Sequence, residues 1–514
     1  MKLSDLLYEG EYTSESNPET IHVQRIVSDT AELSPHCLFV CIRGAHFDSH
    51  RMMTYIAAAR ASAVVVERGC SFERIPSLPV FSVRDSRATL AHLWSRFCGN
   101  PQEKLHLIGI TGTNGKTTTA HLLHAALMEA GVRAGLLGTV SCLLGEEPYT
   151  LPNKGSSAAR MQTMTTPDPD ILFPILQHMR SRGITHVVME VSSHSLQLAK
   201  VVPLHFDIAL FTNLSPEHLD LHKTMENYVQ AKSALFRQCT IGIFNADDAY
   251  AKGLITSAAC RVIRCGTAPE HEYRAERIHT LGVDGVEYLF HSPEASFQLR
   301  LCIPGRFTVY NSLLAATAAL QIGVPSAAIR RAFGQLQGVR GRMERLPLPT
   351  NEFSVFIDYA HTELALRNLL TTVRSFKKDY ERVVLVFGCG GDRDKSKRAP
   401  MGACAEELAD YTILTSDNSR SEDPRQIIKD ILAGFNDKNK RRVITGRKQA
   451  IEHAVIHAQP HDIILLVGKG HEMYELTQSG KRLFDERKIV FEALEKRNSP
   501  HTNDTEPPER TGAL

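Results

Sequence analysis

The sequence has little of what marks several classes of protein. It contains one tryptophan and 7% aromatic residues, and its formal net charge is only +2 over 514 residues. A near-neutral charge balance provides neither a basic face for nucleic acid or a membrane surface nor an acidic tail. We therefore expect no nucleic-acid partner and no membrane partner.

Long apolar runs and paired cysteines are also missing. The longest apolar runs, near 383–387 and 463–467, have the length of a strand and not the roughly 20 residues of a membrane-spanning helix. Residues 1–16 carry charge throughout, unlike a signal peptide. The 11 cysteines are scattered and form no CxxC pair, which favours reduced thiols over a disulfide framework. These absences predict a cytoplasmic protein, which we expect to be a monomer.

The chain is long enough for several hydrophobic cores. Hydrophobic residues make up 43% of it and charged residues 23%, a composition typical of folded domains. Turn signals such as Gly99-Asn100-Pro101 divide it into blocks. We expect domains at 1–101, 102–339 and 340–497, followed by a disordered tail at 498–514 that is rich in proline, threonine and charge.

The blocks alternate strand-like and helical segments. The strands expected are 37–42, 63–67, 79–83, 105–110, 187–191, 208–212, 242–245, 355–358, 383–388, 411–415 and 463–467. The helices expected include 89–97, 117–130 and 398–409. This pattern predicts an α/β protein with a small α/β N-terminal domain, a central parallel-sheet domain that carries a P-loop, and a C-terminal Rossmann-like, doubly wound domain.

A glycine-rich loop lies where the strand at 105–110 leads into the helix at 117–130. Its sequence is Thr111-Gly112-Thr113-Asn114-Gly115-Lys116-Thr117-Thr118. Glycines let backbone N–H groups face a phosphate, and the helix N-terminus adds a favourable dipole. Ile110 stands at the first glycine position of the full P-loop pattern, so an ordinary glycine turn is the alternative. The strand–loop–helix context favours ATP binding by residues 112–118, with Lys116 on the terminal phosphates and Thr117 on Mg²⁺.

Three further side chains could take part in metal chemistry. Glu190 ends an expected strand, at the edge where parallel sheets bind ligands, and we interpret it as a Mg²⁺ ligand. His218 and His222 have the i, i+4 spacing of a zinc pair on a helix, but no HExxH motif completes it. By itself, Lys232 is typical of a solvated helix lysine.

Together, an ordered set of motifs resembles the Mur ligase family. The set spans roughly residues 28–487 and consists of TGTNGKTT, MEVSSH, NLSPEHLDLH, AKSALF, PGRFTVYN, VRGRME, DYAHT, FGCGGDRDKSKR and GKGHE. The resemblance implies an ATP-dependent amide-bond ligase of peptidoglycan precursor synthesis. Its partners would be a UDP-N-acetylmuramoyl dipeptide and a free diamino acid, joined through an acyl phosphate at the D-glutamate of the dipeptide.

The resemblance also implies roles for individual residues in ATP use. Asn311, Arg342 and Asp358 would contact the adenine, phosphate and ribose of ATP. Lys116, Glu190, His218 and Lys232 would be catalytic, and Thr117, Glu190, His218 and Lys232 would hold Mg²⁺. Lys232 would be carbamylated, because a free ammonium repels a metal ion whereas a carbamate is an anion.

The remaining roles concern the two substrates that are joined. The dipeptide would contact Thr30, Thr165, Thr166, Ser192 and Lys200, and the diamino acid would contact Arg398, Asp417, Asn418, Ser419, Arg420, Gly468 and Glu472. Four positions depart from the family's usual residues: Met164 replaces Asn, Lys200 replaces Arg, Thr308 replaces Asn and Ser419 replaces Pro. Arg420 suits the second carboxylate of meso-2,6-diaminopimelate. L-Lysine and L-ornithine stay open as substrates because Ser419 alters that loop.

Other functions are compatible with parts of the sequence. A P-loop switch or motor would leave the later motifs without a role. A folylpolyglutamate-synthase-like ligase would lack the N-terminal block, in which Ser28-Asp29-Thr30 and Leu38-Phe39-Val40 resemble a UDP-binding module. A catalytically silent UDP-sugar-binding module would not need Lys116, Glu190 and Lys232.

Overall fold

The computed structural model describes residues 1–44, 47–150 and 164–498. The tail expected from residue 498 onward therefore lies outside the described residues except for Asn498. The chain forms two compact units. Unit 1 comprises Met1–Glu276, Phe290–Phe297 and Tyr310–Ala332, and unit 2 comprises Arg277–Leu289, Gln298–Val309 and the chain from Phe333 onward.

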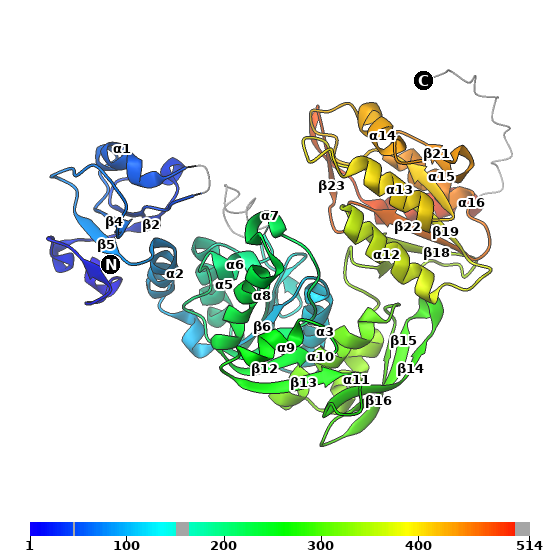
Figure 1. Cartoon of the computed structure of the whole chain (residues 1–514), viewed down its shortest axis with the longest axis horizontal. Coiled ribbons are helices and arrows are strands. Elements are labelled where there is room, and N and C mark those ends of the chain that lie inside the picture. Colours follow the sequence, from blue (N-terminus) through cyan, green and yellow to red (C-terminus); the bar gives the residue numbers. More distant parts are fainter. Residues whose placement is uncertain (45–46, 151–163, 499–514) are drawn as a thin grey trace. The chain divides into compact units, whose positions relative to one another are not determined.

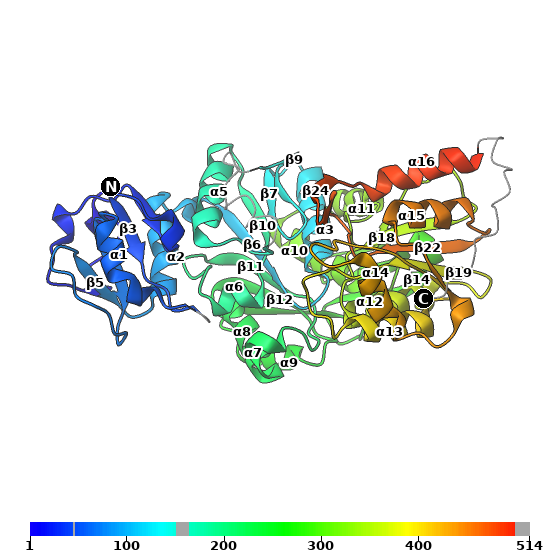
Figure 2. The same cartoon turned by 90° about the horizontal axis from the view of Figure 1, so that it is seen from above.

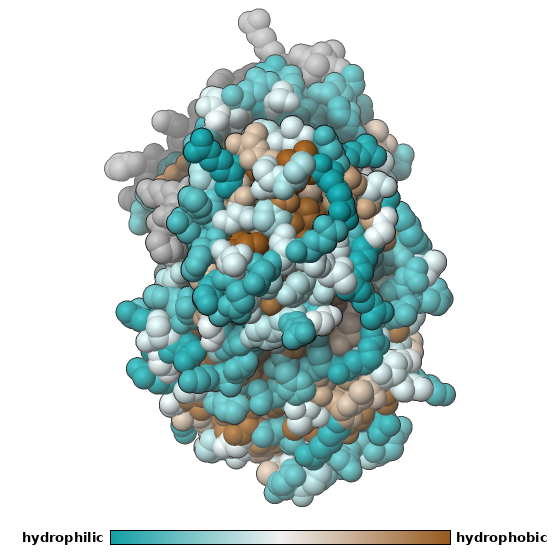
Figure 3. Space-filling model, turned by 90° about the vertical axis from the view of Figure 1, so that its left-hand side faces the viewer, coloured by the Kyte–Doolittle hydropathy of each residue, from teal (hydrophilic) through white to brown (hydrophobic). Residues whose placement is uncertain are grey.

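The N-terminal part of unit 1 is a small five-stranded sheet with the order β1-β5-β4-β3-β2. Its strands are β1 (Tyr12–Thr13), β2 (Arg25–Val27), β3 (Cys37–Val40), β4 (Ala63–Glu67) and β5 (Val80–Val83), and its helices are α1 (Met53–Ala58) and α2 (Ser86–Phe97). Only β1 pairs antiparallel. Helix α2 begins three residues before the expected start because the Asp85 side chain caps it, accepting hydrogen bonds from the backbone N–H groups of Arg87 and Ala88. Figure 3 shows that hydrophilic residues cover much of this end of the molecule, with small hydrophobic patches between them.

The central part of unit 1 is built on a larger sheet. The sheet has 11 strands, and its order from β13 onward is β13-β12-β11-β6-β10-β7-β8-β9, in which the strands from β13 to β7 run parallel. The strands are β6 (His106–Thr111), β7 (Ala134–Leu137), β8 (Cys142–Leu144), β9 (Glu147–Pro148), β10 (His186–Glu190), β11 (Phe206–Phe211), β12 (Cys239–Asn245) and β13 (Arg261–Gly266). Because β6 pairs with β10 on one side and β11 on the other, Thr111, Glu190 and Phe211 end at the same edge. Figure 1 labels β6, β12 and β13 of this sheet.

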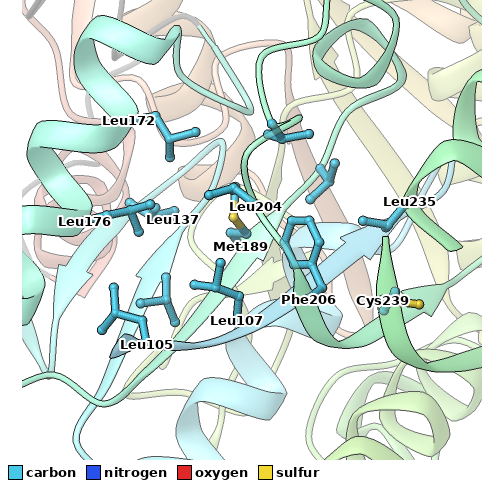
Figure 4. Packing of buried hydrophobic residues seen from close by; sticks show 14 of the residues in the cluster. Leu105, Leu107, Leu137, Leu172, Leu176, Met189, Leu204, Phe206, Leu235 and Cys239 are labelled. Carbon is cyan, nitrogen blue, oxygen red and sulfur yellow. The ribbon is translucent and has the colours of Figure 1, made fainter. Parts of the chain in front are cut away.

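Helices cover this sheet, and apolar side chains fill the space beneath them. The helices are α3 (Lys116–Glu129), α5 (Pro169–Ser181), α6 (Ser193–Gln197), α7 (Leu219–His222), α8 (Met225–Ser233) and α9 (Ala251–Thr256). Leu107, Met189 and Phe206 project from three adjacent strands toward Leu172 and Leu176 of α5 (Figure 4). This core fixes the strand ends that carry the candidate site.

The boundary between the two units passes through secondary structure. It crosses the strands β14 (Tyr273–Thr280), β15 (Val286–His291) and β16 (Ser296–Leu301) and the helices α10 (Phe307–Ile322) and α11 (Ser326–Gln335). The sequence analysis did not predict the three strands. The domain boundaries at 101/102 and 339/340 stay predictions.

Unit 2 contains a six-stranded sheet with the order β17-β18-β22-β19-β20-β21. Its strands are β17 (Glu344–Arg345), β18 (Ser354–Asp358), β19 (Arg382–Phe387), β20 (Tyr411–Leu414), β21 (Arg441–Val443) and β22 (Asp462–Val467), and only β17 pairs antiparallel. A hairpin, β23 (Tyr474–Thr477) and β24 (Gly480–Leu483), follows β22.

Five helices cover the two faces of this sheet. Helices α12 (Glu363–Phe376), α13 (Arg398–Leu408) and α14 (Pro424–Leu432) lie on one face, and α15 (Arg447–Ile456) and α16 (Glu486–Asn498) lie on the other (Figure 2). Each face has its own apolar cluster. This arrangement confirms the predicted α/β class and the doubly wound C-terminal sheet. Among the described residues, no helix is long and apolar enough to cross a membrane.

Candidate functional site

The glycine-rich loop connects β6 to α3 in a conformation that requires glycine. Gly112 and Gly115 have φ angles of 147° and 84°. A Cβ atom at Gly112 would lie 1.9 Å from the Thr212 hydroxyl, and one at Gly115 would lie 2.3 Å from Oδ1 of Asn311. Both positions therefore exclude a side chain. The loop ends at the N-terminus of α3, where the backbone N–H groups and the helix dipole favour an anion.

Lys116 lies against this loop. Its Nζ donates hydrogen bonds to the carbonyl oxygens of Gly112, at 2.9 Å, and Thr113, at 2.8 Å. The same side chain that the motif assigns to the terminal phosphates is thus held over the turn. This geometry is suited to a polyphosphate that is bound by the loop amides.

Glu190 joins the loop to the end of β10. Its side chain is 1% exposed, and its carboxylate accepts hydrogen bonds from the Thr117 hydroxyl at 3.0 Å and from the backbone N–H of Thr139 at 2.9 Å. Gly138 leaves room for it, since a Cβ there would lie 2.2 Å from Oε1. The sequence analysis missed Thr139, because the short strand before it, β7, was not expected.

Lys232 is buried beside the loop. It projects from α8, is 1% exposed, and donates a hydrogen bond to the Gly112 carbonyl at 2.9 Å, the same oxygen that accepts from Lys116. Burial, and then the charge of Lys116, hold the pKa of Lys232 well below its ordinary value. A neutral amine is therefore favoured at this position, which is not the solvated lysine that the isolated sequence position suggested.

The predicted histidine ligands lie in a cluster of aromatic rings. The His218 ring is 4.9 Å from that of His194 and 6.4 Å from that of Tyr228. His222 is 3% exposed, stacks on Tyr228 at 4.8 Å and lies 2.9 Å from the Ser193 hydroxyl. Within residues 1–44, 47–150 and 164–498, no group of three or more His, Cys, Asp or Glu residues is arranged to hold a metal ion. In those residues, the His218–His222 pair therefore has no third His, Cys, Asp or Glu ligand with which to hold zinc.

Three of the predicted dipeptide contacts lie next to Glu190. Thr166 donates its hydroxyl to the Glu190 carbonyl at 2.9 Å and accepts a hydrogen bond from the Ser192 backbone N–H at 3.0 Å. The Thr165 hydroxyl accepts one from the Thr139 hydroxyl at 3.0 Å. These side chains share the edge of the sheet with the glycine-rich loop.

The fourth, Lys200, lies at a pocket of about 360 Å³. Its Nζ pairs with the Asp168 carboxylate at 2.7 Å and lies 3.8 Å from Sδ of Met164. Two of the positions that depart from the family pattern, Met164 and Lys200, thus contact each other. The pocket is also lined by residues of the N-terminal part of unit 1, which include Val27 at the end of β2, Ser28 and Asp29 directly after it, and Trp94 of α2. Thr30, the fifth predicted contact, begins a short 3₁₀ helix capped by the Asp29 side chain.

Asn311 is the predicted nucleotide contact that lies nearest the loop. It is 2% exposed in α10, its Oδ1 faces Gly115, and its Nδ2 has no hydrogen-bond partner among the described residues. A buried donor of this kind is normally satisfied, so it can serve an acceptor on a ligand.

The other two predicted nucleotide contacts belong to unit 2. Asp358 ends β18 and accepts hydrogen bonds from the backbone N–H groups of Met343 and Ala360, both at 2.8 Å. Burial raises the pKa of Asp358, and the charge of Arg342 opposes that effect. The Arg342 guanidinium lies 5.3 Å from the Tyr359 ring centre, and its buried Nε has no partner within the described part of the chain.

Except for Arg398, the predicted diamino-acid residues follow β20 and β22, the two strands that flank β19. Asn418 donates its side-chain N–H to Glu472 at 2.7 Å. A Cβ at Gly468 would lie 2.6 Å from the Asp417 carboxylate, so glycine allows their close approach. Lys469 also lies in this cluster, is 0% exposed, and was missed by the sequence analysis. The signal that could have identified it is its place in the GKGHE motif, two residues after the buried, largely apolar strand β22.

The two arginines of the group differ in their partners. Arg398 is 0% exposed and pairs with Glu422 at 2.9 Å and Asp430 at 2.8 Å. The Arg398 guanidinium thus has two carboxylate partners within the protein. Its predicted contact with the diamino acid stays a prediction. Arg420, with φ at 51°, donates to the Gly391 carbonyl at 2.7 Å and makes no ion pair within 4.0 Å among the described residues. Ser419, between Asn418 and Arg420, is 3% exposed.

The fold and the glycine-rich loop define a nucleotide-binding α/β enzyme, and comparison with known proteins narrows that class. A model of the Mur ligase middle domain matches residues 110–319, and a model of the Mur ligase glutamate ligase domain matches residues 341–470. The chain belongs to the Mur ligase family of ATP-dependent amide-bond ligases, as its motifs predicted.

Curated relatives match over nearly the whole chain. One from Caldanaerobacter subterraneus subsp. tengcongensis is 39% identical and covers 96% of this chain and 99% of its own length. One from Bacillus cereus is 37% identical, with 96% and 98% covered. Both are named UDP-N-acetylmuramoyl-L-alanyl-D-glutamate–2,6-diaminopimelate ligase.

Solved structures agree on the three-domain fold. One of a UDP-N-acetylmuramoyl-L-alanyl-D-glutamate–2,6-diaminopimelate ligase is 27% identical, has a TM-score of 0.67, and covers 97% of this chain and 99% of its own. A Mycobacterium tuberculosis folylpolyglutamate synthase is 19% identical with a TM-score of 0.59, and covers 74% of this chain and 92% of its own. The likeness to the folylpolyglutamate synthase shows only that the two chains share a fold.

Proposed function

We propose that this chain joins meso-2,6-diaminopimelate to the D-glutamate of UDP-N-acetylmuramoyl-L-alanyl-D-glutamate, with ATP as the energy source, in the synthesis of peptidoglycan precursors. One observation carries the chemistry of this proposal. The glycine-rich loop, Glu190 and Lys232 are joined by direct hydrogen bonds at one edge of the central sheet. The names of the near-full-length relatives support the choice of substrates.

The reaction needs activation because a carboxylate is a poor electrophile. The γ-phosphoryl group of ATP passes to the D-glutamate carboxylate, giving ADP and an acyl phosphate. The neutral amine of the diamino acid then attacks the acyl carbon, phosphate leaves, and the amine loses a proton. Phosphoryl transfer of this kind depends on positioning and charge neutralisation more than on covalent help from the protein.

The residues of unit 1 suit the first of these steps. Lys116 and the N-terminus of α3 neutralise the phosphates of ATP, and the unpartnered Nδ2 of Asn311 donates to the nucleotide. Thr165, Thr166 and Ser192 bring hydroxyl groups to the strand end occupied by Glu190, where the dipeptide carboxylate has to meet the γ-phosphate.

The donors at this strand end also fit Mg²⁺. A hydroxyl from Thr117 and the carboxylate of Glu190 are the hard oxygen ligands that this ion prefers. Burial lowers the pKa of the Lys232 amine, which shifts it toward the neutral form. In that form the amine can add to CO₂, which forms a carbamate and releases a proton. A carbamate at this position and His218 would complete the predicted ligand set. Bound there, Mg²⁺ would neutralise charge on the phosphates.

The choice of diamino acid rests on Arg420. Its guanidinium makes no ion pair in the described part of the chain, so it can accept the second carboxylate of diaminopimelate. Asp417 and Glu472, which both lie 3.6 Å from Nζ of Lys469, can hold an ammonium group. L-Lysine and L-ornithine lack that second carboxylate and would leave Arg420 without a substrate anion.

A direct ligation assay tests the proposal. The purified chain is incubated with UDP-N-acetylmuramoyl-L-alanyl-D-glutamate, ATP, Mg²⁺ and one of three amino acids, meso-diaminopimelate, L-lysine or L-ornithine, and the product mass is recorded. We expect the diaminopimelate product to form with the highest kcat/KM. A preference for L-lysine or L-ornithine would contradict the substrate choice, and no product with any of the three would contradict the ligase. The cytoplasmic location and the monomeric state stay predictions.

A further inference from the structure

A buried lysine ammonium lies between the two carboxylates of the diamino-acid group. Lys469 is 0% exposed, and its Nζ lies 3.6 Å from Asp417 and 3.6 Å from Glu472. Its ammonium also lies 5.7 Å from the centre of the Phe484 ring, a largely buried side chain. A buried ammonium is costly unless it is paired and hydrogen-bonded, so these contacts hold the charge in place.

Lys469 also fixes the side chain that links the two carboxylates. Its Nζ donates to Oδ1 of Asn418 at 2.9 Å, and the same oxygen accepts from the Leu476 backbone N–H at 2.9 Å. The amide N–H of Asn418 is thereby directed to Glu472, at 2.7 Å. Removal of the lysine would therefore loosen Asn418 and Glu472 together.

The charges of this cluster cancel. Asp417 and Glu472 contribute two negative charges, and Lys469 contributes one positive charge. Arg420 contributes a second positive charge, since it acts together with both carboxylates on the pKa of the neighbouring Tyr474. Arg342 acts with them on the pKa of Tyr359, but its own charge is opposed by Asp358. Arg447 is also close to Asp417, but its own charge is neutralised by Glu486 at 2.7 Å. A neutral cluster suits a zwitterionic group, which carries one ammonium and one carboxylate, better than it suits a lone ammonium.

We propose that Lys469 is a positioning and specificity-determining residue of the diamino-acid site. Its fixed charge makes the cluster neutral, so the site accepts the zwitterionic end of diaminopimelate and disfavours the uncompensated ammonium of L-lysine. This inference rests on the proposed function. Two effects would then disfavour L-lysine. The Lys469 cation balances the carboxylates of Asp417 and Glu472, and L-lysine has no second carboxylate to pair with Arg420.

Two substitutions that change the net charge of the cluster in opposite directions test this role. In Lys469→Met the cluster becomes negative, and we expect the ratio of kcat/KM for diaminopimelate to that for L-lysine to fall by about tenfold or more. Lys469→Arg, which keeps the charge, should restore most of the ratio. Glu472→Gln makes the cluster positive and should raise the ratio, which gives a second test should Lys469→Met fail to fold.

The controls separate positioning from general damage. The KM values for ATP and the nucleotide dipeptide should change less than about twofold in Lys469→Met, since the change acts through the amino-acid site. Lys448→Met removes a half-exposed lysine of the same unit, paired with Glu492 at 3.3 Å, and should leave all constants unchanged. A folded Lys469→Met with the wild-type ratio would overturn the inference, as would a Glu472→Gln variant that lowers the ratio. Absence of ligation by the wild type would instead overturn the proposed function.

Discussion

Buried lysines lie in both candidate sites, and their surroundings give them different chemistry. Lys232 has a carbonyl oxygen and the charge of Lys116 for neighbours, so burial favours its neutral form. Lys469 lies between two carboxylates that balance its charge. The first environment suits a nucleophilic amine and the second a fixed cation.

Replacement of Lys232 should nearly abolish ligation. We expect Lys232→Ala to lose activity by about a hundredfold or more, because the variant lacks the anion that a carbamate would supply near the phosphates. Acetate or formate should restore part of the rate by occupying that position. Initial rates with and without added carboxylate measure both effects. The exposed Lys252 of α9 provides the control, since Lys252→Ala should match the wild type; a near-wild-type rate for Lys232→Ala would contradict the assignment.

Replacement of Arg420 should weaken the preference for diaminopimelate. Arg420→Ala removes the cation predicted to face the second carboxylate, so kcat/KM for diaminopimelate should fall by roughly 10-fold to 100-fold and that for L-lysine much less. Arg425 lies nearby in sequence and can compensate in part. Competition between the two amino acids, with product masses compared, measures the change. Arg442→Ala, an exposed arginine on β21, serves as control; an unchanged preference in Arg420→Ala would contradict its role.

At the scale of elements, the first turn of α16 joins several site loops. Glu486 is 1% exposed and pairs with the buried Arg447 at 2.7 Å. Arg447 in turn donates to the carbonyls of Ser416 and Val467, the residues directly before Asp417 and Gly468. The next residue, Arg487, donates to Glu344 at 2.8 Å, two residues beyond Arg342. The helix therefore stabilises the loops that carry both groups of candidate residues in unit 2.

Loss of this buried pair should destabilise unit 2 strongly. Glu486→Ala leaves the Arg447 charge buried without its carboxylate, which typically costs about 3–5 kcal/mol. Glu492→Ala removes a more exposed partner of Lys448 on the same helix and should cost less than about 1 kcal/mol. Urea unfolding followed by circular dichroism measures both free energies. Equal losses in the two variants would contradict the role of the Arg447–Glu486 pair.

The elements differ in how far the sequence predicts them. Strands such as β19 and β22 are continuous apolar runs buried on both faces, and both were predicted within one residue of their starts. Strands β15 and β16 alternate buried with more exposed residues, which is the period-two pattern of a half-buried strand. A search for apolar runs passes over that pattern. The α/β class therefore follows from the sequence, whereas the meander β14–β16 does not.

The site residues show a similar limit. The motifs predicted Thr117 and Glu190 as ligands of Mg²⁺, Thr117 for a first ion and Glu190 for a second, and these roles stay predictions. The two side chains are joined by a hydrogen bond although 73 positions separate them, a contact that the sequence did not predict. The burial of Lys469 and Arg447 was not predicted, because lysine and arginine normally lie at the surface. Their partners come from distant strand ends, and only the folded sheet brings those ends together.

At the scale of the whole molecule, the candidate residues are divided between the units. Unit 1 carries the glycine-rich loop and the predicted dipeptide contacts, and unit 2 carries Arg342, Asp358 and the diamino-acid cluster. An enzyme whose ATP chemistry serves bond formation should release phosphate continuously only when all substrates are present. A P-loop switch or motor has no such requirement.

Phosphate release therefore distinguishes a ligase from an ATPase. With ATP alone we expect almost no phosphate release. With ATP and the nucleotide dipeptide we expect at most about one equivalent of ADP per enzyme and almost no phosphate, because the phosphoryl group stays on the acyl phosphate, which has no amine to attack it. Addition of diaminopimelate should start steady release, with one amide formed per phosphate. A coupled phosphate assay follows the time course, and product mass gives the ratio. The Lys116→Ala variant should release no phosphate under any of the three conditions, since it lacks the cation that neutralises the phosphates of ATP. If the wild type released phosphate steadily with ATP alone, that result would favour the switch or motor over the ligase.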